Sequence, residues 1–265
     1  MKAKEQARQF KKLWEKMSEH LQQFYDTQDP EEMHQMRVNI KKIKAMLSLL
    51  TDAKKQKKSA EQLKKLKKIF AHAGKLRDVH VNMNILSSEG VENDAFATAQ
   101  ANILSNETSK LYAHHDEYNK TLKKAFKVLS DTFEDISDKQ IVRIFDRQME
   151  ELYQYFNKDL AFDDTLHHAR MMIKELMYVH QVLTEDVKDK LRWNIEYLDD
   201  LQTEIGNWHD TWVILDLLKS SLHEKPETTR QLESKLLSME HQIVLLASYF
   251  KKMHRIPLVL KAEKL

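Results

Sequence analysis

Apolar residues recur every three or four positions along most of this chain, which is the spacing of one face of an α-helix. The first such stripe consists of Phe10, Trp14, Met17, Leu21 and Phe24. The whole pattern predicts eight helices, four in each half of the chain. We expect them at about residues 4–25, from residue 30, at 59–86 and 92–129, around 141–156, from residue 164, at 187–222 and from residue 226. A lysine-rich link should connect the second helix to the third.

Polar residues that favour helix starts mark two of these boundaries. Asp29 is a suitable N-cap, Pro30 fits the first helical position, and two glutamates follow in the first turn. Residues 163–165 supply a similar cap before the sixth helix. Residues 131–138 form the predicted hinge between halves 1–132 and 133–265, and the tail after Pro257 should be loosely held. These signals predict two four-helix bundles related by a pseudo-two-fold axis.

The composition supports an all-α fold. Only three glycines and three prolines occur in 265 residues, so few positions favour turns. The chain contains no cysteine, which excludes disulfides and thiolate chemistry. No apolar stretch has the length of a secretory signal core or a membrane span. We therefore expect a soluble, cytoplasmic protein.

Two short motifs occur once in each half, 132 or 133 residues apart, as in a structural repeat. The pattern His-x-x-Arg-x-x-x-Lys is formed by His34, Arg37 and Lys41, and again by His167, Arg170 and Lys174. The second motif is Gly74-Lys75-Leu76-Arg77-Asp78, and again Gly206-Asn207-Trp208-His209-Asp210. Because the residues kept in both copies are mainly basic, the repeat indicates an anionic ligand.

The net charge of +2 conceals a strong local field. Residues 37–77 hold 14 Lys and Arg against Asp52 and Glu61, a net charge of +12. At 100° per residue, positions 34, 37, 41 and 44 fall within an arc of about 80° over about 15 Å of helix. Such a row suits a linear polyanion. Taken singly, Lys41, Lys42 and Lys44 could also form an ordinary solvated face.

The remaining motif residues have structural interpretations. Asp78 and Asp210 are expected to form salt bridges with Arg37 and Arg170 and to fix their direction. Glycine is unfavourable in a helix interior, so Gly74 and Gly206 indicate a close helix approach or a ligand near the backbone.

Three other functions compete with polyanion binding. Glu31-x-x-His34 and Asp164-x-x-His167 resemble half of a di-iron motif, but capping explains the acids and the nearby cations would repel a metal, so we expect no metal site. The basic segment could attract nucleic acid without reading its sequence. No phosphate-binding glycine loop or activated nucleophile indicates an enzyme. The four tryptophans are expected to fill cores; they are Trp14, Trp193, Trp208 and Trp212.

The two motifs resemble those of the CHAD domain, the conserved-histidine α-helical domain. The family pattern is H-x-x-R-[VI]-x-x-[RK]-[RK]-[LI]-[RK] followed by G-x-x-R-D. Residues 34–44 and 74–78 fit it closely, and residues 167–174 fit its start. The resemblance covers nearly the whole chain. It implies two four-helix bundles whose basic faces line a central cleft or pore that binds inorganic polyphosphate. We expect neither catalysis nor a cofactor. Polyphosphate granules and their proteins are the expected partners.

The resemblance also implies the residues that bind polyphosphate. They are His34, Arg37, Lys41, Lys42, Lys44, Lys75, Arg77, His167, Arg170, Lys174 and His209. The second copy departs from the pattern, because Glu175 and Met177 stand at basic positions and His209 replaces an arginine. We expect the second half to bind more weakly. Charge reversal at Arg37 and Lys41 should therefore cost more affinity than reversal at Arg170 and Lys174, and the fold should survive both.

Overall fold

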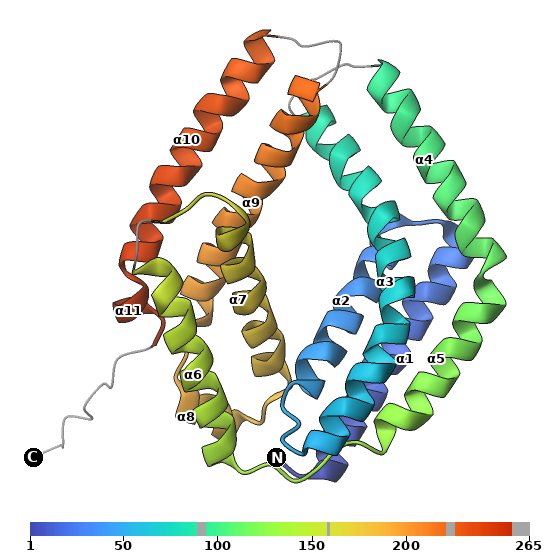
Figure 1. Ribbon diagram of the computed structural model, residues 1–265, viewed down its shortest axis with the longest axis vertical. Coiled ribbons are helices and arrows are strands. Elements are labelled where there is room, and N and C mark those ends of the chain that lie inside the picture. The colour runs from blue at the N-terminus through green and yellow to red at the C-terminus, as the bar shows by residue number, and fades with distance from the viewer. Residues whose placement is uncertain (89–93, 158–159, 221–225, 256–265) are drawn as a thin grey trace, which may run out of the picture. The chain divides into compact units, whose positions relative to one another are not determined.

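The protein is described by a computed structural model that covers residues 1–88, 94–157, 160–220 and 226–255 (Figure 1). These residues form eleven helices and no strand, which confirms the predicted all-α class. The first five are α1 (Ala3–Thr27), α2 (Pro30–Leu47), α3 (Ala53–Ser88), α4 (Asp94–Ala113) and α5 (His115–Ser130). The others are α6 (Asp138–Phe156), α7 (Asp164–Val182), α8 (Glu185–Leu191), α9 (Ile195–Ser220), α10 (Pro226–Ser248) and α11 (Phe250–Met253). Within the described ranges, no helix has both the length and the apolar character needed to cross a bilayer.

The chain divides into two compact units. Unit 1 comprises Met1–Ser137 and Val213–Arg230, and unit 2 comprises Asp138–Trp212 and Gln231–Leu265. Helices α9 and α10 each contribute residues to both units. The division into residues 1–132 and 133–265, as two halves related by a pseudo-two-fold axis, stays a prediction.

The predicted apolar stripes form the cores of both units. In unit 1, α1 packs along α2, and Phe10, Met17 and Ile43 are almost completely buried. Each such side chain contributes about 1.5–3 kcal/mol relative to an exposed one. Both predicted caps are present, because the side chains of Asp29 and Asp163 accept hydrogen bonds from the amides two residues ahead.

Three predicted boundaries were wrong. The lysine-rich link is helical, because α3 already begins at Ala53. The helix predicted at 92–129 breaks at His114, where both the ring and the amide of His114 bond to the carbonyl of Lys110. The helix predicted at 187–222 breaks after Leu191, where Arg192 adopts a left-handed conformation with φ of 54°.

The second break has a packing cause. It places Trp193 in the core of unit 2, with its ring centroid 4.5 Å from that of Phe145. Trp14 and Trp208 are also buried, as predicted. Trp212 is not, since 48% of its surface is exposed. The tail after residue 257 lies outside the described residues.

The predicted hinge is a loop whose Glu134 binds the two residues that precede α3. One carboxylate oxygen, Oε1, accepts hydrogen bonds from the amides of Thr51 at 2.7 Å and Asp52 at 2.9 Å. The other oxygen lies 3.5 Å from Nζ of Lys55. Burial by itself raises the pKa of Glu134, but the two amides and Lys55 together lower it below its ordinary value. The loop therefore holds the start of α3 through a charged carboxylate.

We predict that Glu134→Ala lowers the free energy of unfolding by about 1–3 kcal/mol, because it leaves two amides without their acceptor. Glu134→Gln keeps an acceptor oxygen and should cost less. Because the pKa of Glu134 is lower in the folded state, its contribution is present at neutral pH and is lost as pH falls below about 4.3. Urea unfolding at several pH values measures both effects. If the Glu134→Ala variant is as stable as wild type at pH 7, Glu134 does not have this stabilising role.

Candidate functional site

The first half of the repeat brings the Arg37 side chain of α2 onto Gly74 of α3. Nη1 of Arg37 donates a hydrogen bond of 2.9 Å to the carbonyl of Phe70, four residues before the glycine. The guanidinium carbon also lies 4.3 Å from the centre of the Phe70 ring, a cation–π contact. A Cβ atom at Gly74 would lie only 2.4 Å from Nη1. The missing side chain of Gly74 therefore makes the space that Arg37 occupies.

The second half repeats this arrangement between α7 and α9. Nε of Arg170 donates a hydrogen bond of 3.1 Å to the carbonyl of Gln202, again four residues before the glycine. A Cβ atom at Gly206 would lie 2.5 Å from Nη2 of Arg170. We call each of these an arginine–glycine contact. It explains why arginine and glycine recur at the same spacing. The space beside each glycine is occupied by an arginine side chain, not by the backbone of a neighbouring helix or by a ligand.

The two aspartates of the motif act on different neighbours. Burial lowers the pKa of Arg37, while the charge of Asp78 raises it. The predicted salt bridge between Asp78 and Arg37 stays a prediction. Asp210 lies with Oδ1 3.3 Å from Nδ1 of His209. Its charge also raises the pKa values of His167 and Lys174, against stronger effects that lower them. A salt bridge between Asp210 and Arg170 stays a prediction.

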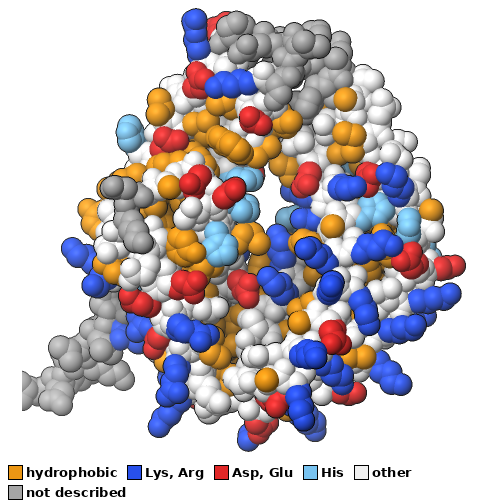
Figure 2. Space-filling model, in the orientation of Figure 1, with side chains coloured by type: hydrophobic (Ala, Val, Ile, Leu, Met, Phe, Trp, Pro, Cys, Tyr) orange, Lys and Arg blue, Asp and Glu red, His pale blue; other side chains and the backbone are white. Residues whose placement is uncertain are grey.

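The predicted row on α2 lies beside the buried apolar face. His34, Arg37 and Lys41 are half-buried, and Lys44 is exposed in the last turn. Burial lowers the pKa of the neighbouring Lys42, and the like charge of Lys16 on α1 lowers it further. The space-filling view shows many Lys and Arg side chains on the side where Figure 1 places α1, α2, α3 and α5 (Figure 2). Lys16 thus adds a cation that the motifs did not reveal.

The two residues of α3 that were predicted to bind polyphosphate have different surroundings. Arg77 is half-buried, and its charge lowers the pKa of Arg37, so the two cations are near one another. Lys75 is instead directed to α4, with Nζ 3.4 Å from Oε2 of the buried Glu107. Lys110 lies 2.7 Å from the other oxygen of Glu107. Glu107 carries no spacing signal in the sequence, so its pairing with Lys75 could not be predicted.

The second pair of helices presents imidazoles beside its cations. The ring centroids of His167 and His209 are 4.4 Å apart. Burial lowers the pKa of Lys174, and the charge of Arg170 adds to this, while Asp199 and Asp210 oppose it. The cations of unit 2 are therefore partly neutralised by nearby acids. Among the described residues, no group of three or more His, Asp or Glu side chains could hold a metal ion.

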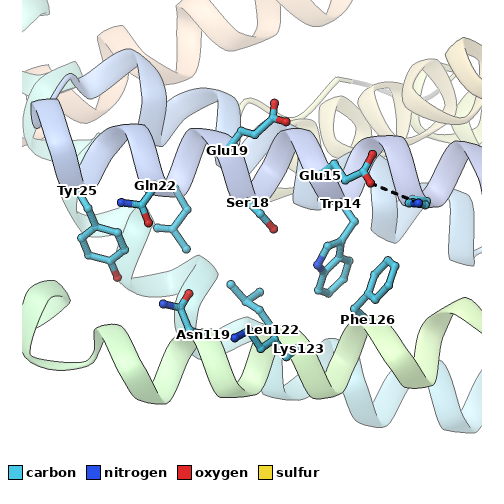
Figure 3. A pocket seen from close by; sticks show the side chains of 12 residues that line it. Trp14, Glu15, Ser18, Glu19, Gln22, Tyr25, Asn119, Leu122, Lys123 and Phe126 are labelled. Carbon is cyan, nitrogen blue, oxygen red and sulfur yellow. Dashed lines mark ion pairs between the residues drawn. The ribbon is translucent and has the colours of Figure 1, made fainter.

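A groove of about 530 Å³ lies elsewhere in unit 1, between α1 and α5 (Figure 3). Trp14 and Phe126 line one part of it, and Glu15 and Glu19 lie along its α1 side. Lys11 is 3.7 Å from Glu15. None of the residues predicted to bind polyphosphate lines this groove, and its acids do not suit an anion.

We predict that alanine at Gly74 has opposite effects in two backgrounds. In Arg37→Ala, the change Gly74→Ala should raise the free energy of unfolding by about 0.5–1 kcal/mol, the ordinary gain at a mid-helix glycine. In wild type, the new methyl group displaces a charged hydrogen bond worth about 1.5–3 kcal/mol, so the protein should lose stability. Chemical unfolding of the four proteins measures the coupling. Equal effects in both backgrounds would refute the contact.

We predict that His167 titrates below the ordinary histidine pKa of about 6.5. Burial lowers its pKa most, followed by the charges of His209 and Arg170. His209→Ala should therefore raise it. Histidine side-chain NMR across pH 4–8 measures the pKa of His167 in the wild type and in the variant. A wild-type pKa at or above 6.5 would contradict the prediction. Because the charged form is disfavoured in the folded state, His167 also reduces stability as pH falls through 6.5.

Comparisons with known proteins support the sequence resemblance. The family model described as CHAD domain matches residues 8–219. The crystal structure of the CHAD domain from the plant Ricinus communis has the same fold, with a TM-score of 0.64 over 96% of this chain and 92% of that one, at 16% identity. No curated protein sequence matches this chain. The matched region spans both arginine–glycine contacts, and the chain belongs to the CHAD domain family.

Proposed function

We propose that this protein binds inorganic polyphosphate, without catalysing a reaction, through the basic faces of α2 and α3 and more weakly through α7 and α9. The observation that carries the proposal is the crowding of cations around α2. Burial lowers the pKa of both Lys42 and Arg37. The like charge of Lys16 lowers that of Lys42 further, and the like charge of Arg77 lowers that of Arg37, against the opposing charge of Asp78. Holding like charges together is unfavourable in the free protein, and a bound polyanion removes that cost.

The shape of the row favours a linear ligand. From His34 to Lys44 it extends about 15 Å along α2. A chain of phosphates offers a negative charge at regular intervals along this length, whereas a single phosphate would satisfy only part of it. Lysines contribute as point charges with flexible stems, and Arg37 holds its position through Phe70.

The corresponding face of unit 2 should contribute less. Its permanent cations are Arg170 and Lys174, and the charges of Asp199 and Asp210 act on Lys174. His209 stands where the first half has Arg77. The proposed setting is the cytoplasm, with polyphosphate granules and their associated proteins as partners.

The structure changes the choice of test residues. Reversal at Arg37 or Arg170 was expected from the sequence to leave the fold intact, but each side chain is half-buried and bonds to a helix carbonyl. A glutamate there would bury a charge beside a carbonyl oxygen, so loss of binding could follow from unfolding. Lys41 and Lys44 are the better test.

We predict that Lys41→Glu with Lys44→Glu weakens binding of long-chain polyphosphate by at least about tenfold, since each charged contact is worth roughly 1.5–3 kcal/mol. The slope of log affinity against log salt should fall by about 1.4 for two lost contacts. The control is Lys124→Glu with Lys127→Glu, two exposed lysines of α5 at the same spacing. Circular dichroism should show both variants folded.

Titration calorimetry measures both quantities. If the two double variants lose the same affinity, binding depends on overall charge, and the proposed row on α2 is wrong. Lys174→Glu should have a smaller effect than Lys41→Glu.

A further inference from the structure

Trp212 is a large aromatic side chain at the surface of unit 2. Of its area 48% is exposed, whereas Trp14, Trp193 and Trp208 are each at least nine-tenths buried. It follows His209 by three residues on α9, with ring centroids 6.4 Å apart. The indole is therefore not part of the core of unit 2.

The side chains next to Trp212 are imidazoles. His209 packs on His167 with centroids 4.4 Å apart. Nδ1 of His167 is buried and has no hydrogen-bond partner. A buried polar nitrogen without a partner is costly. Asp210 lies near Nδ1 of His209, so Nε2 of the same ring is the nitrogen available to hydrogen-bond a ligand.

A permanent cation, Arg170, lies next to the imidazoles. Arg170 covers Gly206, one turn before His209, and bonds to the carbonyl of Gln202. The order along α9 is therefore an indole, an imidazole pair and then a guanidinium. From Trp212 back to Gln202 the helix rises about 15 Å. This length accommodates a flat ring followed by a short run of phosphates.

The first half has different residues at the positions that correspond to His209 and Trp212. Allowing for the repeat offset of 132, His80 corresponds to Trp212 and Arg77 corresponds to His209. Unit 1 thus has an additional permanent cation where unit 2 has an imidazole, and a small ring where unit 2 has an exposed indole. The first half suits a ligand that carries charge alone, and the second suits one that also carries an aromatic ring.

We propose that this face of unit 2 binds a nucleotide, with the nucleobase against Trp212 and the phosphates along His209, His167 and Arg170. The inference rests on the proposed function for the anion-binding role of the second repeat, but it assigns that repeat a different ligand class. Stacking of a base on an aromatic side chain tolerates any base, so the class is nucleotides in general.

The test compares ATP with inorganic tripolyphosphate, which has the same number of phosphates and no ring. Titration calorimetry in the presence of EDTA gives both affinities without a metal. ATP should bind roughly 5- to 150-fold more tightly, the factor that corresponds to one stacked base. ATP should also quench tryptophan fluorescence, because Trp212 is the exposed tryptophan of the described residues.

Trp212→Leu should abolish the preference for ATP and leave the affinity for tripolyphosphate unchanged. The control is Tyr249→Leu, which removes an aromatic side chain of unit 2 with the same exposure of 48%. It should keep the preference. Both positions are exposed, and circular dichroism should match wild type.

Equal affinity for ATP and tripolyphosphate would overturn the nucleotide site, as would a preference that survives Trp212→Leu. These results do not depend on long-chain polyphosphate, whose affinity for the wild-type protein is measured separately. A wild-type protein that prefers ATP but does not bind long-chain polyphosphate would count against the proposed function alone. Intact long-chain binding without an ATP preference would count against this inference alone.

Discussion

The contact between an arginine and a helical glycine occurs in each of the two units and determines how the motif residues are placed there. In an α-helix the carbonyl four residues before the glycine already accepts the glycine amide, so the guanidinium adds a second hydrogen bond to the same oxygen. It can approach only where no Cβ stands in the way, as at Gly74 and Gly206. This interaction fixes α2 against α3 and α7 against α9. The lysines and histidines one turn from each arginine are positioned as a consequence.

The sequence predicted the all-α class, most of the helical segments and the two caps, because these depend on local spacing and on residue preferences within one turn. It also showed that Arg37 and Gly74 belong together, but not that one fills the space left by the other, since that depends on how two helices meet. The burial of Glu107 between Lys75 and Lys110 and the exposure of Trp212 are likewise tertiary effects. The breaks at His114 and Arg192 follow from a side-chain bond to the backbone and from the burial of Trp193.

The arginine–glycine contact occurs in both halves, but the charges around it differ. Arg77 in the first half is charged at every physiological pH, whereas His209 in the second lies beside His167 and Asp210. Crowded permanent cations favour a ligand with dense, regular charge. Imidazoles beside an exposed indole favour a ligand with fewer charges and a flat ring. The same arginine–glycine contact can therefore support two kinds of anion recognition in one chain.

The central claim is that a linear polyanion lies along α2, and comparing chain lengths tests it most directly. Affinities of long-chain polyphosphate and tripolyphosphate, expressed per binding site, should be measured between about 50 and 200 mM salt. The account predicts tighter binding of the long chain and a steeper salt slope, near −3 if about four cations contact phosphates. Equal affinities with the same shallow slope would contradict it, because a short ligand would then satisfy the whole row.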